Sequence, residues 1–137
     1  MPLILSVSAN SRTASRSRTL AGYLYNPPHW RGRAAASWDD GSWRLTGTLS
    51  YIGGVVDTRA SPPDKVHGMT TLDLSARYRF IREGSVLDGL EVGVSANNLF
   101  NAMPAQITTT TWADTPYDST NYSPVGRFLA LEVVKKW

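Results

Sequence analysis

The sequence predicts an all-β protein with about six antiparallel strands. Apolar and polar residues alternate with a period of two in several segments, and no segment longer than a turn or two carries a 3.6-residue apolar pattern. Short and long connections also alternate along the chain, which is typical of a row of hairpins. These two observations together indicate the all-β class.

The first two expected strands differ in the strength of their alternation. The segment Leu3–Ala9 has an apolar residue at every odd position. The segment Arg33–Trp38 is the weaker case, because Ala34, Ala36 and Trp38 form its apolar side. Side chains in a strand point alternately to opposite faces, so each segment would present one apolar face.

The other four expected strands alternate more clearly. In Trp43–Gly53 the odd positions are apolar or glycine as far as Tyr51, and arginine, threonine and serine lie between them. In Thr71–Phe80 the even positions are apolar. Leu90–Asn97 and Leu129–Val133 continue the pattern. All four segments therefore predict strands with one apolar and one polar face.

The connections predict a membrane barrel. Asp39–Ser42 is a tight turn and Ile81–Asp88 a short link, whereas Asn10–Gly32, Gly54–Gly68 and Asn101–Pro124 are long and polar. Short periplasmic turns at one end and long outer loops at the other are typical of outer-membrane barrels. Strands of ~10 residues also match the length that crosses a bilayer when tilted. No apolar run is long enough for a membrane-spanning helix, which excludes helical membrane proteins.

The aromatic residues predict an interfacial girdle. If strand directions alternate, five of them share the short-turn end and the apolar face. Aromatic rings favour the headgroup level of a bilayer, whereas a soluble sandwich has no reason to sort its aromatics by height. The expected girdle consists of Trp38, Trp43, Tyr78, Phe80 and Trp137.

The composition offers little catalytic or metal chemistry. The chain has no cysteine and two histidines, His29 and His67, both in expected outer loops, where a shared metal or siderophore contact is the less favoured interpretation. Asp114, Asp118 and Asn121 lack the spacing of a calcium loop and are expected in a solvated loop. We therefore expect no catalytic residue, no metal site, no cofactor and no enzyme.

The charges indicate a lipid partner and a wet interior. The net charge is +3, and no acid precedes Asp39. Five arginines in this stretch favour anionic lipopolysaccharide over nucleic acid, because no groove-reading element presents them. We expect the charged side chains of the polar strand faces to serve solvation and cross-strand pairing rather than ligand passage. The five arginines are Arg12, Arg16, Arg18, Arg31 and Arg33, and the charged strand residues include Arg44, Asp73, Arg77, Arg79 and Glu91.

The residues also resemble a known family, the TonB-dependent outer-membrane receptors. The stretch Pro116–Phe128, running on to Trp137, resembles the last loop and strand of these receptors. Asn97–Asn101 resembles their penultimate-strand motif, and Tyr25–Tyr51 resembles an upstream hairpin. Thr71–Phe80 fits the strand between, so the likeness covers most of residues 20–137.

The resemblance implies a transmembrane barrel of about 22 strands closed by an N-terminal plug that binds TonB. We therefore expect residues 1–137 to be a single C-terminal segment of such a barrel, with no plug domain and no signal peptide. It also implies a bacterial outer-membrane location and, for the intact protein, TonB-dependent uptake of a siderophore or similar nutrient. The TonB system would act only through the plug, and the transported ligand is left open.

The last strand resembles the signal that the barrel-assembly machinery recognises in its clients. The matching alternate positions are Leu129, Leu131, Val133 and Trp137, whereas Lys135 stands where an apolar residue is usual. Two other classes stay open at this point. One is a small structural or adhesive outer-membrane protein that oligomerises, and the other is a soluble β domain that binds a ligand.

Overall fold

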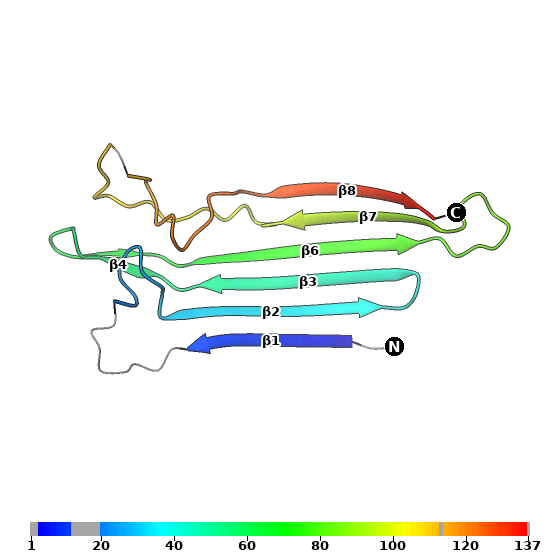
Figure 1. Cartoon of the computed structure of the whole chain (residues 1–137), viewed down its shortest axis with the longest axis horizontal. Coiled ribbons are helices and arrows are strands. Elements are labelled where there is room, and N and C mark those ends of the chain that lie inside the picture. Colours follow the sequence, from blue (N-terminus) through cyan, green and yellow to red (C-terminus); the bar gives the residue numbers. More distant parts are fainter. Residues whose placement is uncertain (1–2, 12–19, 113, 137) are drawn as a thin grey trace.

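A computed structural model describes residues 3–11, 20–112 and 114–136, and its main feature is one six-stranded antiparallel sheet (Figure 1). Neighbours in the sheet follow the order β1-β2-β3-β6-β7-β8, so each main strand pairs with the next one along the chain. The described residues contain no helix that is long and apolar enough to cross a membrane. The strands are β1 (Leu3–Ser11), β2 (Trp30–Asp39), β3 (Trp43–Ile52), β6 (Met69–Arg79), β7 (Leu90–Asn97) and β8 (Phe128–Lys135).

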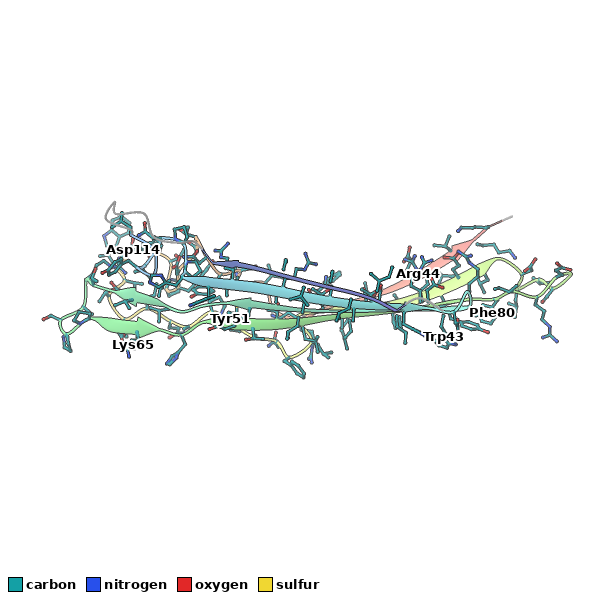
Figure 2. The ribbon with its side chains drawn as sticks, turned by 90° about the horizontal axis from the view of Figure 1, so that it is seen from below. Trp43, Arg44, Tyr51, Lys65, Phe80 and Asp114 are labelled. Atoms are coloured by element: carbon teal, nitrogen blue, oxygen red, sulfur yellow. The ribbon has the colours of Figure 1, made fainter. Side chains whose placement is uncertain are left out.

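The register gives the sheet two different faces. One row of paired residues runs from Trp38 through Leu45, Ala76 and Val94 to Leu131. The next row of paired residues toward the long loops points to the other face of the sheet, because successive side chains of a strand point to opposite faces. That row is polar where the first is apolar. Trp43 and Arg44, which are neighbours on β3, accordingly lie on opposite sides of the sheet (Figure 2). The sheet therefore has an apolar face and a polar face.

The apolar face is exposed in this structure. Leu5 is 69% exposed, Val94 is 54% exposed and Leu131 is 72% exposed. A soluble protein covers such a face with a second layer, because exposed apolar surface costs free energy in water. The described residues provide no second layer over it.

The short turn between β2 and β3 closes through a side chain. The Oδ1 atom of Asp40 accepts hydrogen bonds from the backbone N–H groups of Ser42 and Trp43, at 3.0 Å and 2.6 Å. Gly41 has a φ of 93°, which a residue with a Cβ rarely adopts. The tight hairpin expected from Asp39–Ser42 is confirmed.

The expected long loop 54–68 contains a second, smaller sheet. β4 (Val55–Asp57) pairs with β5 (Asp64–Val66) and prolongs the β3–β6 hairpin at the outer end (Figure 1). Gly54 and Gly68 permit this, since a Cβ at either would lie 2.5 Å from a backbone oxygen of the opposite segment. The sequence pattern missed these strands because three residues are too few to show alternation.

The buried apolar core lies among the long loops and at the adjoining end of the main sheet, where Met69 begins β6. It joins the segment 20–29, the β4–β5 hairpin and the loop between β7 and β8. The outer loops therefore form one packed unit at one end of the sheet. The core residues are Leu24, Val55, Val66, Met69, Ile107 and Tyr122.

Asn98 ties the end of β7 to the loop that follows. Its side chain donates to the backbone oxygens of Ala102 and Val125, at 2.8 Å and 3.2 Å, and accepts from the N–H of Ala102 at 2.8 Å. Its own N–H donates to Asp73 Oδ1 on β6, at 2.8 Å. Asn98 has a φ of 49°, a conformation that asparagine tolerates better than most residues.

We expect the Asn98→Ala variant to be less stable by about 1–3 kcal/mol, because it removes three hydrogen bonds that the buried Asn98 side chain makes to the following loop. The measurement is the urea midpoint of the protein in detergent micelles. The exposed neighbour Asn97 supplies the control, since surface substitutions usually change stability by less than about 0.5 kcal/mol. Equal losses in Asn98→Ala and Asn97→Ala would contradict the role given to Asn98.

Candidate functional site

The short-turn end of the sheet carries an aromatic cluster. The rings of Trp43 and Tyr78 lie 4.8 Å apart, and Phe80 meets the edge of Tyr78 at the same centroid distance. Trp38 lies at this end too, on the strand next to Trp43. Four of the five residues of the expected girdle thus share one end of the sheet, whereas Trp137 lies outside the described residues.

The last strand presents its apolar residues outward. Leu129, Leu131 and Val133 are exposed on the apolar face. Lys135 follows them on the same face, but its ammonium donates to the backbone oxygens of Val86 and Asp88 in the β6–β7 link. A long basic side chain at the rim of an apolar surface can reach polar groups in this way.

The polar face carries ion pairs near the short turns. Arg44 and Arg77 are direct register partners, so their like charges oppose each other across β3 and β6. Arg44 Nε pairs with Asp39 Oδ2 at 2.7 Å, and Arg77 Nη2 reaches Glu132 Oε2 at 2.5 Å. The second pair passes over β7 at Gly93, where a Cβ would lie 3.5 Å from the Arg77 side chain. Each arginine is thus drawn away from the other.

A third group of charges completes this region. Glu91 on β7 accepts from Arg79 at 2.6 Å and from Lys136 at 3.1 Å. The cross-strand pairing expected for this face is therefore found at Arg44, Arg77, Arg79 and Glu91. Asp73, also expected there, instead accepts the hydrogen bond from the Asn98 backbone.

A buried carboxylate joins the outer loops. Asp118 is 0% exposed and accepts hydrogen bonds from the N–H of Tyr25 at 3.1 Å and from the Asn121 side chain at 2.8 Å. Asn121 in turn accepts from Arg31 Nη2 on β2 at 2.7 Å. The hydroxyl of Tyr122 donates to the Gly53 oxygen at 2.7 Å, and burial raises the pKa of this phenol to about 12.

The expectation that Asp118 and Asn121 lie in a solvated loop is wrong. Both are buried. Backbone N–H groups and the Asn121 amide satisfy the oxygens of Asp118 in place of water, and the Arg31 guanidinium satisfies the side-chain oxygen of Asn121. The Asp118-x-x-Asn121 spacing could have suggested a local hydrogen-bonded turn, since such side chains often bind nearby backbone. Nothing in the sequence indicated that Tyr25 would be a partner.

A second buried carboxylate, Asp57 at the end of β4, organises a polar cluster. Arg59 donates to it through Nε at 3.0 Å and Nη2 at 3.1 Å, and the hydroxyl of Thr109 donates to Oδ2. Arg59 also lies 3.5 Å from Asp114 and stacks over the ring of Tyr25, 5.5 Å from its centroid. The hydrogen bonds from Arg59 lower the pKa of Asp57 to about 2. We call this set of five residues the Asp57 cluster.

The remaining site residues expected from the sequence stay apart. His29 packs its ring over Gly22, and His67 is exposed between β5 and β6. Within residues 3–11, 20–112 and 114–136, no three histidine, aspartate or glutamate side chains form a group that could hold a metal ion. Asp114 pairs with Arg59, so it does not join Asp118 and Asn121. Arg12, Arg16 and Arg18 lie outside the described residues.

Comparison with known families agrees with this architecture. A family model described as "TonB dependent receptor-like, beta-barrel" matches residues 4–99. The chain belongs to this family. No curated protein and no solved structure matches it.

The TonB-dependent receptors are outer-membrane receptors and transporters, and they are not enzymes. The match includes β1 to β7 and ends at Leu99. It therefore extends further toward the N-terminus than the resemblance drawn from the motifs. The loop that holds Asp118 and the whole of β8 lie beyond it.

The Asp57 cluster predicts an acid sensitivity of the outer loops. Because folding lowers the pKa of Asp57, its contribution to stability is complete above the unfolded value near 4 and is lost as the pH falls toward about 2. We expect pepsin to cleave the loops of an Asp57→Asn variant faster than those of the unaltered protein at pH ~5. The difference should disappear by pH ~2. A constant ratio of cleavage rates across this range would contradict the prediction.

Proposed function

We propose that the chain forms the C-terminal sector of an outer-membrane receptor barrel, and that the intact receptor takes up a siderophore or a similar nutrient with energy supplied through TonB. The single observation that carries the proposal is the two-faced sheet. Its apolar face is exposed over strands of 8 to 11 residues, and its polar face holds ion pairs. Lipid on one side and water on the other satisfy both faces at once.

The unpaired edges of the sheet support the proposal that it is part of a larger barrel. Within the described residues, β1 and β8 each pair on one side only. An open sheet edge is not tolerated in a bilayer, because its N–H and C=O groups would have no partner. In the proposed receptor, further strands of the same polypeptide would pair with β1 and β8 and close the barrel.

The two ends of the sheet would then face different compartments. The short-turn end would lie at the periplasmic headgroups, with Trp38, Trp43, Tyr78, Phe80 and Trp137 as the girdle. The outer loops would face lipopolysaccharide and capture the nutrient. The strand carrying Leu129, Leu131, Val133 and Trp137 would be recognised by the barrel-assembly machinery, and the plug of the intact receptor would contact TonB.

A stand-alone protein that oligomerises through the same two edges is the second candidate. β1 supports it, because the strand contains neither charged residues nor proline that would block pairing with another chain. A soluble ligand-binding β domain is disfavoured by the uncovered apolar face.

The size of the native polypeptide separates these candidates. An antibody against the peptide 109–122 would be used to blot outer-membrane fractions of the source cells. We expect a band several times larger than 15.0 kDa in this fraction. A band near 15.0 kDa there would instead support the oligomer, and a band confined to the soluble fraction would overturn both membrane proposals.

Two neighbouring substitutions test which face meets lipid. Leu131→Arg would place a cation on the apolar face, at a cost of about 2–4 kcal/mol near the bilayer centre, and should abolish assembly of the receptor. Ala130→Arg would place the same side chain on the polar face and should be tolerated better. Assembly is measured as the heat-modifiable band on a gel after folding into lipid vesicles. Equal defects in the two variants would refute the assignment of faces.

A further inference from the structure

A groove runs across the apolar face of the main sheet. It has a volume of about 850 Å³, which lies within the range of small-molecule sites. It extends from β2 to β8 across five neighbouring strands. Its larger lining side chains include Trp38, Leu45 and Leu131, which share one row of the apolar face. The groove is therefore open on the side that meets lipid in the proposed receptor.

The hollow of the groove follows residues with little or no side chain. Ala36 and Gly47 line it from β2 and β3, where they are register partners, and Ala76 and Ala96 line it from β6 and β7. The neighbouring lining positions carry leucine, valine and tryptophan, so the surface is lower along the small residues. A hollow in a membrane-facing surface attracts apolar atoms, because its lining otherwise loses dispersion contacts. The groove thus selects an apolar occupant.

The dimensions of the groove fit one hydrocarbon chain. The spacings between its five strands amount to ~19 Å, since neighbouring strands lie ~4.8 Å apart. One leaflet contributes about half of the ~30 Å hydrocarbon core of a bilayer, so its chains are of comparable length. Strands that are tilted by ~45° incline the groove by the same angle. An acyl chain can therefore follow the groove without leaving its own leaflet.

The depth of the groove points to the leaflet at the short-turn end. The row of Trp43 and Tyr78 lies two residues beyond the row of Leu45 toward the short turns, a step of ~7 Å. Trp43 and Phe80 lie on the apolar side of the sheet, opposite Arg44 (Figure 2). Because such rings favour the headgroup level, the groove would begin just inside the headgroups of this leaflet. In the proposed receptor this is the periplasmic leaflet.

Trp38 offers a polar contact at the edge of the groove. Its ring lines the groove at the end formed by β2. Within residues 3–11, 20–112 and 114–136, its indole N–H makes no hydrogen bond, so it can donate to an ester or phosphate oxygen of a lipid. We infer that the groove binds and retains one glycerophospholipid of the periplasmic leaflet, with an acyl chain along the small residues. The inference rests on the proposed receptor function.

Native mass spectrometry of the intact receptor, extracted from outer membranes in a mild detergent and then washed, tests the inference. We expect one glycerophospholipid to stay bound to each receptor after washes that remove the other lipids. Ala76→Phe and Ala96→Phe should each lower the retained fraction by about tenfold, because a phenyl ring fills the groove. Trp38→Phe keeps an aromatic ring but removes the N–H donor, and should lower the fraction by about fivefold.

Ala34→Phe is the matched control. It adds the same ring to the apolar face of β2 outside the groove, so the lipid should be retained. The heat-modifiable gel band shows that each variant has assembled before its lipid is measured.

Three outcomes would overturn the inference and leave the receptor function intact. The first is equal retention in the Ala34, Ala76 and Ala96 variants, or no lipid on the unaltered receptor. The second is lipopolysaccharide in place of a phospholipid, which would assign the groove to the other leaflet. The third is a pair of receptors that separates in the groove variants, which would assign the groove to a second copy. The receptor function itself fails only if the outer-membrane blot fails.

Discussion

The backbone of the sheet must have its hydrogen bonds satisfied while its two faces meet different surroundings. Antiparallel pairing supplies the hydrogen bonds for every inner strand, so the side chains alone decide what each face contacts. Because the side-chain period is two, one choice of register sends the whole row from Trp38 to Leu131 to the same face. A slip of one residue would move the arginines of the polar face into the apolar one. The alternation therefore enforces both the register of the strands and the face to which each side chain points.

The outer loops are organised by buried carboxylates as much as by apolar packing. Asp118 binds the backbone of the first outer loop from the last one, and Asp57 gathers Arg59 and Thr109 around the tip of the β4–β5 hairpin. Both interactions join segments far apart in the chain, and both satisfy a charge that would otherwise be costly to bury. These contacts therefore hold the three loops in one arrangement.

The short-turn end is organised by aromatic packing and exposed ion pairs instead of buried carboxylates. Its aromatic rings cluster on the apolar face, while opposed arginines on the polar face are separated by pairing with Asp39 and Glu132. Lys135 shows how the two surroundings meet, because its stem lies on the apolar side and its ammonium reaches backbone oxygens of the β6–β7 link. In a receptor barrel this end would mark the boundary between lipid, headgroups and the wet interior.

The sequence by itself determined the all-β class, the six main strands, their faces, the tight turn at Gly41 and the family, because these depend on local alternation, turn chemistry and recognisable motifs. It also indicated which charged residues share the polar face. The tertiary structure alone decided that β4 and β5 pair, that Asp118 and Asn121 are buried, and that Tyr25 meets Arg59. These contacts join positions separated by up to about 90 residues. A one-dimensional pattern carries no record of them, since a loop aspartate looks the same whether water or a distant N–H group satisfies it.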